Sequence, residues 1–302
     1  MSRLIVLVGL PGSGKSTLAQ KLKIEYKAEI ISSDALRKEL YGTELDQNHN
    51  SEVFAEMQKR TIDLLKLNKN VIYDATNINS KKRMHLLRCT NKYTKTTICY
   101  FLATPYEMCL ERNNQRVDRK VPEEVIKRML YSFHTPSIRE GFKEIKVIYP
   151  ENYQKNLDVE FLPDVPHDNP NHTLSVKEHM QETFTLASKK ATVDGFEQTN
   201  SFKLLEISSY YHDLGKFYTK VFDEKGIAHY YNHENVGAYK IFEVPLNSLD
   251  DNELLKVSLL INWHMRPYSW KSKEDKEKAK KFLGPRLFNL LNKLHECDEE
   301  AH

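Results

Sequence analysis

The chain has 302 residues, of which 40% are hydrophobic and 29% are charged, and its formal net charge at pH 7 is +3. This length favours about two domains, and the composition is that of a globular protein rather than a disordered or fibrous one. No apolar run approaches the roughly 20 residues of a membrane-spanning helix, and the small positive charge permits a nucleic-acid partner without indicating one.

The ends and the cysteines favour a cytoplasmic protein with no membrane partner. The apolar run at residues 4–10 is too short for a signal-peptide core. The four cysteines contain no C-x-x-C pair, which favours reduced thiols over disulfides: Cys89, Cys99, Cys109 and Cys297.

The first half of the chain alternates strand-like and helix-like segments. We expect strands at residues 4–8, 29–32, 70–73, 96–103 and 145–148. We expect helices at residues 17–25, 51–67, 81–89, from about 106 onward, and 122–133. This alternation predicts an α/β domain with a doubly wound parallel sheet.

A glycine-rich loop follows the first expected strand. It has the form G-x-x-x-x-G-K-[ST], and the residues expected to bind a nucleotide are Gly9, Gly12, Ser13, Gly14, Lys15, Ser16 and Thr17. Glycines let successive backbone N–H groups point at phosphate oxygens, and the helix that follows adds its positive N-terminal end. Lys15 would reach the β- and γ-phosphates, and Ser16 would ligate Mg²⁺.

Two carboxylates come at the ends of later strands, where ligands bind in parallel sheets. Asp34 could accept the proton of an attacking hydroxyl, or it could merely cap the next helix. Arg37, one turn on, could clamp a substrate phosphate. Asp74, in the run Asp-Ala-Thr-Asn, could hold a Mg²⁺-bound water or orient Lys15, or it could belong to a polar turn.

An arginine-rich segment lies further along. Arg112 and Arg116 are one helical turn apart, so both can point at one target, and Arg119 and Lys120 follow. A mobile lid of this kind would supply cations over a transferring phosphoryl group. The alternative is a solvated basic helix face.

In this order, G-L-P-G-S-G-K-S-T, S-D-x-x-R, D-A-T-N and R-x-x-x-R resemble the 5′-OH polynucleotide kinases of bacteriophage and bacterial RNA-repair enzymes, over residues 2–149. The resemblance implies ATP and Mg²⁺ as cofactors, with Lys15 binding the phosphates and Ser16 the Mg²⁺. It makes Asp34 the general base for the 5′-hydroxyl and places Arg37 on the adjacent phosphate. Arg112 and Arg116 would be lid arginines, and Asp74 matches a strand-end aspartate common to such kinases.

The character of the chain changes after residue 149. A proline-rich stretch indicates a linker, so we expect a kinase-like domain at 1–152, a linker at 153–170 and a second domain at 171–302. The second domain is helical almost throughout, with helices expected at 175–190, 201–211, 234–242, 251–263, 273–283 and 286–301.

This helical half contains histidines and aspartates that could serve as metal ligands. His212 and Asp213 are adjacent at the end of an apolar helix, and the other candidate metal ligands are His179, His233, His264 and Asp298. Imidazole and carboxylate together suit Mn, Fe, Co, Ni or Zn, and such an ion would activate water for phosphate-ester hydrolysis. His172 and His229 stay open between a surface and a ligand role.

The sequence H-D-L-G-K between helices resembles the HD-domain phosphohydrolases over residues 171–302. The resemblance implies an all-α fold in which His179, His212, Asp213 and Asp298 hold a first metal. His233 and His264 would help to hold a second, and Lys216 would lie near the phosphate. Asp298 departs from the pattern, because it lies so close to the C-terminus that its helix can fray.

Together the two motif sets predict an enzyme that heals broken nucleic acid. The kinase would phosphorylate a 5′-hydroxyl of RNA or DNA, and the HD domain would remove a 3′-phosphate or a 2′,3′-cyclic phosphate, preparing ends for a separate ligase. Three alternatives remain open: a small-molecule or tRNA kinase fused to an HD nucleotidase, a nucleotide-gated RNA-binding or regulatory protein with a non-hydrolytic HD fold, and a toxin-like kinase acting on a metabolite. The aromatic residues near the HD motifs are expected mostly to pack in the helical core, although such rings can also stack on bases: Tyr210, Tyr211, Tyr230, Tyr231, Trp263 and Trp270.

Overall fold

The computed structural model describes residues 2–44, 46, 48–117, 119–169, 173–193 and 200–301, without the side chains of 191–193. Contacts divide the chain into two units, Met1–Leu130 with Pro136–Tyr153, and Tyr131–Thr135 with Gln154–His302. Among the described residues, no helix is long and apolar enough to cross a membrane. His172, a histidine of open role, lies outside the described residues.

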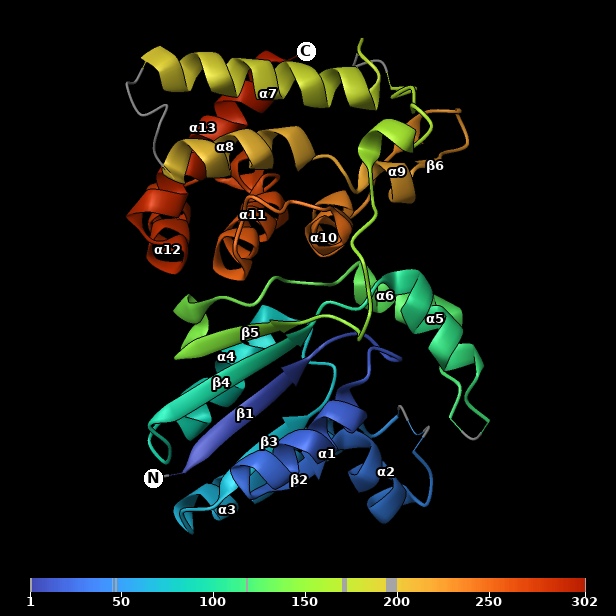
Figure 1. The fold of residues 1–302 in the computed structure, drawn as a ribbon, viewed down its shortest axis with the longest axis vertical. Helices are drawn as coiled ribbons and strands as arrows, with labels where there is room; N and C mark the ends of the chain where they lie inside the picture. The colour runs from blue at the N-terminus through green and yellow to red at the C-terminus, as the bar shows by residue number, and fades with distance from the viewer. Residues whose placement is uncertain are drawn as a thin grey trace. The chain divides into compact units, whose positions relative to one another are not determined.

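The first unit is built on a five-stranded sheet in the order β2-β3-β1-β4-β5 (Figure 1). Its strands are β1 (Arg3–Val8), β2 (Ala28–Ser32), β3 (Asn70–Asp74), β4 (Thr96–Leu102) and β5 (Glu144–Ile148). All neighbouring strands are parallel. Five of the six residues of β1 are buried, as expected for a central strand covered on both faces. The predicted doubly wound parallel sheet is confirmed.

Helices connect these strands in the expected order. They are α1 (Lys15–Tyr26), α2 (Ser33–Tyr41), α3 (Asn50–Lys66), α4 (Ser80–Thr90), α5 (Tyr106–Asn114), α6 (Glu123–Leu130) and the short η1 (Ile138–Glu140). The expectation that α6 continues to residue 133 is wrong, because the chain leaves the helix after Leu130 to join the other unit.

A buried ion pair fixes the loop beyond β3. Arg83 on α4 donates two hydrogen bonds to Glu140 of η1, of 2.7 and 2.6 Å, and a third of 2.8 Å to the carbonyl of Asn77. Neither charged side chain is accessible to solvent. Such a pair is tolerated in a core only when its remaining polar atoms are also bonded, as they are here for Arg83. Arg83 is therefore structural rather than part of a binding surface.

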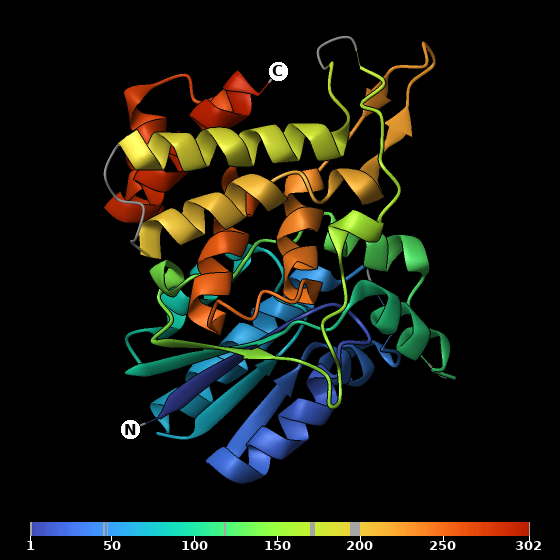
Figure 2. The ribbon, with the colours of Figure 1, turned by 45° about the horizontal axis from the view of Figure 1, so that its top comes forward.

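The second unit is helical. Its main helices are α7 (Val176–Val193), α8 (Asn200–Tyr211), α9 (Lys216–Thr219), α10 (His233–Lys240), α11 (Asp251–Trp263), α12 (Lys273–Leu283) and α13 (Pro285–Glu300). Helices α7 and α8 run side by side in both ribbon views (Figures 1 and 2). A two-stranded antiparallel ribbon, β6 (Val221–Phe222) and β7 (Ala228–His229), lies between α9 and α10 in the chain. The short turns η2 (Val159–Phe161), η3 (Ile241–Glu243) and η4 (Pro267–Ser269) complete it.

The segment Tyr131–Thr135 belongs to the helical unit although it follows α6 in the chain. The amide of Asn262 donates to the carbonyl of Phe133, over 3.2 Å, and the amide of Asn235 donates to the carbonyl of Tyr131, over 2.8 Å. These two amides also bond each other, over 2.7 Å. The ring of Phe133 is fully buried. The helical unit is therefore completed by a piece of chain from the first half.

Candidate active sites

The glycine loop forms a phosphate cradle between β1 and α1. Gly12 has φ +85°, and a Cβ at this position would overlap the backbone oxygen of Cys109, so only glycine fits. Gly14, at φ +97°, is the N-cap of α1. The Lys15 ammonium donates to the carbonyls of Gly9, over 3.0 Å, and Leu10, over 2.8 Å. The structure therefore gives this loop the backbone shape that a P-loop needs.

A cavity of about 580 Å³ opens over the cradle. Among the residues that line it are many of the predicted ones: Gly12, Gly14, Lys15, Ser16, Thr17, Asp34, Arg37, Asp74 and Arg116. Gly9 and Ser13 lie in the same loop without lining the cavity, and Ser13 is buried. Burial lowers the pKa of the Lys15 ammonium and raises the pKa of the Asp74 carboxyl, while the attraction between these two groups opposes both shifts. A hydrogen bond from Ser16 also lowers the pKa of Asp74.

Asp34 lines the cavity and does not cap helix α2. Helix α2 begins at Ser33 and its N-cap is Ser32, so the alternative that Asp34 merely caps the helix is not supported. One oxygen of Asp34 accepts from Arg37, over 3.1 Å, and the other accepts from Arg119, over 3.3 Å. The side chain of Asp34 keeps 41% of its accessibility, so a substrate hydroxyl can reach it.

Two residues of this side were missed as candidates. Asn50, at the start of α3, accepts a hydrogen bond of 2.7 Å from Arg37 and so fixes the guanidinium beside Asp34. Arg119 pairs with both Asp34 and Glu44, the latter over 3.1 Å. Arg119 belongs to the arginine-rich segment, but it lies outside the R-x-x-x-R pattern that singled out Arg112 and Arg116 as site residues.

The two predicted lid arginines lie in different places. Arg116 lines the cavity together with Arg119 and Lys120. Arg112, on α5, does not line it, but its guanidinium lies 3.8 Å from the position that a Cβ would take on Gly14. Both are thus close to the cradle, Arg116 at the cavity and Arg112 at the glycine loop.

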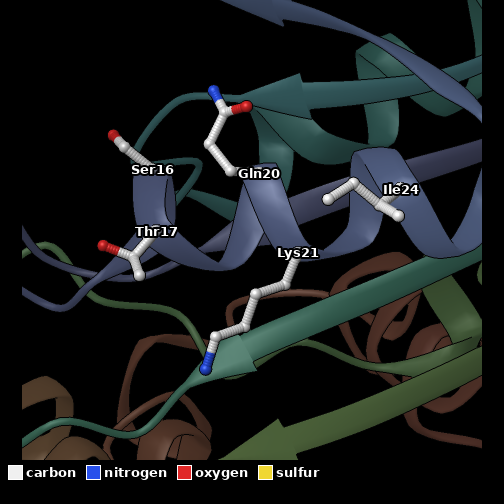
Figure 3. Close-up of a pocket in the computed structure, with 5 residues that line it drawn as sticks. All are labelled: Ser16, Thr17, Gln20, Lys21 and Ile24. Carbon is white, nitrogen blue, oxygen red and sulfur yellow. The ribbon is translucent and has the colours of Figure 1, made fainter.

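A second, shallow cavity of about 520 Å³ runs along the exposed side of α1. Figure 3 shows that its lining side chains all come from this helix, from Ser16 and Thr17 in the first turn to Ile24. Ser16 and Thr17 line both cavities, so the two meet at the start of α1. Lys21, which also lines the second cavity, pairs with Glu151 over 3.0 Å.

The helical unit brings all six predicted metal ligands together. The Nε2 atom of His179 lies 3.2 Å from that of His212, and the Nε2 atom of His233 lies 3.1 Å from that of His264. Asp213 lies between the two pairs: its Oδ2 is 3.3 Å from His212 and its Oδ1 is 3.2 Å from His233. The ligand atoms form two groups that share Asp213, one with His179 and His212, the other with His233 and His264.

Backbone carbonyls orient all four imidazoles. The Nδ1 atoms of the histidines face the carbonyls of nearby residues, at 3.2 Å for His179, 2.8 Å for His212, 2.8 Å for His233 and 2.7 Å for His264. An Nδ1–H that donates to a carbonyl leaves Nε2 as the lone-pair nitrogen, and this is the usual outer arrangement of a metal-ligating histidine. Converging lone pairs and shared carboxylates fit one or two transition-metal ions.

Asp298 is held firmly despite its place near the C-terminus. Its Oδ1 lies 3.0 Å from His179 and 3.3 Å from His212, and its Oδ2 accepts a 3.0 Å hydrogen bond from Tyr268. Helix α13 continues to Glu300, so Asp298 lies in its last turn, and the expectation that this end can fray stays a prediction. Tyr268 is a further residue that sequence patterns did not single out.

The carboxylates of Asp213 and Asp298 stay ionised at this centre. Burial disfavours the charged forms of His212 and Asp213, but their mutual attraction overcomes it, so the pKa of His212 rises to about 10 and that of Asp213 falls well below its usual range. The pKa of the Asp298 carboxyl also falls well below its usual range, because the charge of His212 opposes the effect of burial. Ionised carboxylates are the form that binds a divalent cation, and the proton on His212 would have to leave when a cation binds.

Lys216, which is predicted to lie near the phosphate, lies against this centre, where a further histidine contacts it. The Lys216 ammonium is 2.7 Å from Asp213 Oδ2 and 3.1 Å from Nε2 of His167. Burial, and then the charge of Lys216, lower the pKa of His167 to about 4, so its imidazole is neutral and can accept from Lys216. His167 lies in the proline-rich linker, where no periodicity marks it, and sequence analysis missed it.

Comparisons with known proteins agree with this geometry. Residues 4–136 match the family model described as an AAA domain, and residues 164–295 match the one described as an HD domain. Each model covers less than half of the chain, and the two do not overlap. The chain therefore combines a P-loop domain with a kinase-type α/β fold and a helical HD domain, the two domain types that the sequence motifs indicated.

More specific likenesses each cover about half of the chain or less. The bifunctional polynucleotide phosphatase/kinase of Schizosaccharomyces pombe is 25% identical over 149 residues, which are 48% of this chain and 33% of that protein. A chain of the Pnkp1/Rnl/Hen1 RNA repair complex is 26% identical, with a TM-score of 0.39 over 43% of this chain and 45% of that one. A putative kinase from Chloroflexus aurantiacus is 14% identical, with a TM-score of 0.39 over 51% of this chain and 92% of that one. The chain spans less than half the length of the first two relatives. The sequence-based recognition of a polynucleotide-kinase-like domain joined to an HD domain is confirmed.

Proposed function

We propose that this protein heals broken nucleic-acid ends. Its P-loop domain transfers the γ-phosphoryl group of ATP to a 5′-hydroxyl of RNA or DNA, and its HD domain removes a 3′-phosphate or a 2′,3′-cyclic phosphate. The observation that carries the proposal is the presence of two separate phosphate-handling sites on one chain, the cradle with Asp34 and the centre around Asp213. A broken strand has a 5′ end and a 3′ end, so it is a substrate for both sites.

In the kinase site, the 5′-oxygen of the substrate bonds to the γ-phosphorus of ATP while Asp34 accepts the proton of the 5′-hydroxyl. The bond between the γ-phosphorus and the β-phosphate oxygen breaks, and ADP leaves. Arg37 and Arg119 position the carboxylate of Asp34, and Arg37 meets the phosphate next to the hydroxyl. Lys15, Arg112 and Arg116 stabilise the charge on the β- and γ-phosphates. A Mg²⁺ ion held through Ser16, with Asp74 beside it, would neutralise the phosphate oxygens.

The hollow along α1 suits the rest of the nucleotide. It shares the lining residues Ser16 and Thr17 with the phosphate cavity, so a donor whose phosphates fill the cradle would extend its nucleoside part toward Gln20 and Ile24. The exposed side chain of Ile24 offers an apolar surface to a base.

In the HD site, His179, His212, Asp213 and Asp298 would hold a first transition metal, and His233 and His264, with Asp213 shared, a second. When bound, such ions supply a nucleophilic water at neutral pH and Lewis-acid activation of a phosphate ester. Lys216 binds the phosphate, held in place by His167. The oxygen of a water bonds to phosphorus as the bond from phosphorus to the 3′-oxygen breaks, and the 3′-oxygen takes up a proton from water, leaving a 3′-hydroxyl and inorganic phosphate. With a 2′,3′-cyclic phosphate, a first water opens the ring by breaking the bond from phosphorus to the 2′-oxygen, and the same step then follows.

The products, a 5′-phosphate and a 3′-hydroxyl, are what a nucleic-acid ligase joins, so a separate ligase is the partner this function implies. A small-molecule acceptor for the kinase is less well supported, because it leaves the fused HD domain without a shared substrate. We infer a cytoplasmic location from the reduced cysteines, among them the buried Cys99 and Cys109.

Variants that disable one site each test the proposal. Lys15→Ala should abolish 5′-phosphorylation and leave 3′-phosphate release unchanged. The double variant His212→Ala, Asp213→Ala should do the reverse. Parallel loss of both activities in either variant would contradict two separate sites, and an unchanged kinase in Lys15→Ala would remove the cradle from the mechanism.

A further inference from the structure

The ribbon formed by β6 and β7 presents an exposed aromatic face beside the metal centre. In Figure 2 it projects from the helices of its unit. Val221 pairs with His229, and Phe222 pairs with Ala228. Val221 and His229 are paired, so their side chains share one face, and Phe222 and Ala228 share the other. Ala228 is fully buried, whereas Val221, Phe222 and Tyr231 keep 49%, 60% and 62% of their accessibility, so the ribbon and the turn after it expose side chains on both faces.

Tyr231, in the turn after β7, stacks on His229, which lies on the same face as Val221. The rings of His229 and Tyr231 are parallel within 5°, with centroids 5.3 Å apart. A 3.0 Å contact to Asp223 from the Nε2 atom of His229 fixes this imidazole. The base of the ribbon is anchored, because the N–H of Ala228 donates to the carbonyl of Asp168, over 2.9 Å. A rigid aromatic surface left in water is costly unless something covers it.

The ribbon leads directly into the HD site. Tyr230, the neighbour of Tyr231, has its ring 5.5 Å from the ammonium of Lys216. Two residues after Tyr231 comes the metal ligand His233, and two residues of chain span at most about 7 Å. The backbone of Tyr231 therefore lies close to the metal ligand His233, and its neighbour Tyr230 contacts Lys216.

Resting on the function proposed above, we propose that Val221, His229 and Tyr231 form a stacking platform for the last bases of a single-stranded polynucleotide 3′ end, which delivers the terminal phosphate to Lys216 and the metal ligands. Stacking on an aromatic ring tolerates any base, as an enzyme for broken ends requires. The turn of the ribbon carries Asp223 and Glu224 beside Lys225, so it has no net positive charge to attract a phosphate backbone. The platform therefore recognises bases rather than the charged backbone.

The test compares two oligonucleotides of equal length and charge, both with a 3′-phosphate, one of which has abasic sites at its last two nucleotides. For the full-length protein with Mn²⁺, kcat/KM for 3′-phosphate release should be roughly ten-fold higher on the oligonucleotide with bases. Tyr231→Ala should abolish this preference without changing turnover of the abasic substrate. Tyr231→Trp should keep it. Phe161→Ala is the matched control, because Phe161 is also an exposed aromatic residue of this unit, and it should behave as the wild type.

Two results would overturn the platform: equal turnover of both substrates by the wild type, or an unchanged preference in Tyr231→Ala. Salt dependence adds a readout that a folding defect would not produce. Tyr231→Ala should weaken binding of the oligonucleotide with bases, but the slope of log affinity against log salt concentration should stay unchanged. If neither oligonucleotide is hydrolysed, the proposed function fails, and the platform is judged by fluorescence anisotropy of the same two oligonucleotides. Tighter binding with bases then supports it, and equal binding refutes it.

Discussion

Replacing Arg83 by methionine should destabilise the P-loop unit strongly. The substitution removes three hydrogen bonds and leaves the carboxylate of Glu140 in a place with no access to solvent. Removing one partner of a buried ion pair costs about 3–5 kcal/mol, and the further bond to Asn77 places Arg83→Met toward the upper end. With a denaturant dependence of about 2 kcal/mol per molar urea, the midpoint of unfolding should fall by roughly 1.5 M or more.

The chain offers a way to follow the two units separately. Both of its tryptophans, Trp263 and Trp270, lie in the helical unit, so tryptophan emission reports that unit, while far-ultraviolet circular dichroism reports both. Arg83→Met should shift only the transition seen by circular dichroism. The matched control is Lys69→Met, which removes the exposed 3.4 Å pair with Glu29 in the same unit and should leave the midpoint unchanged.

A double variant separates loss of an ion pair from loss of packing. Arg83→Met with Glu140→Leu replaces both charges by apolar groups and should recover most of the lost stability, since buried pairs replaced as a whole are often neutral. A loss below about 1 kcal/mol in Arg83→Met, or a double variant no more stable than the single one, would refute this reasoning.

The helical unit allows three further predictions. Gly215→Ala should abolish 3′-phosphate release and spare the kinase, because a Cβ at Gly215 would overlap the backbone oxygen of the predicted metal ligand His233. Elemental analysis should then find less bound metal, and a normal metal content would contradict this prediction. Asn262→Leu should lower the tryptophan-detected unfolding free energy by about 1–3 kcal/mol, because it removes the hydrogen bonds from Asn262 to the carbonyl of Phe133 and to Oδ1 of Asn235. Treatment with a chelator followed by dialysis into Mg²⁺ should restore 5′-phosphorylation alone, and Mn²⁺ or Ni²⁺ should then restore 3′-phosphate release. Recovery of both activities with Mg²⁺ alone would argue against a transition-metal centre.

Much of both sites follows from local sequence. The glycine loop and Asp34 follow the ends of β1 and β2, and Asp74 is the last residue of β3. Parallel strands bring their carboxyl ends to one edge of a sheet. The HD ligands are recognisable because imidazole and carboxylate recur at helix ends, as in His212 and Asp213. These signals need only short stretches of chain and the chemistry of their residue types.

What sequence patterns did not reveal depends on long-range packing. The segment Tyr131–Thr135 reads as the end of a helix, yet Thr135 bonds Ser258, which is 123 residues away, over 2.7 Å. His167 lies in a linker without periodicity, and only the folded chain brings it to Lys216. Tyr268 likewise meets Asp298 across two elements. Residues that support a site from outside carry no spacing rule, because their partners come from elsewhere in the chain.

The central claim is that one chain handles both ends of a broken strand, and one reaction tests it most directly. A short RNA with a 5′-hydroxyl and a 3′-phosphate is incubated with γ-labelled ATP and Mg²⁺, with and without Mn²⁺ or Ni²⁺, and both ends are analysed. We expect a 5′-labelled RNA that loses its 3′-phosphate only when the transition metal is present. No label on this RNA or on the matching DNA would contradict the account and assign the kinase another acceptor.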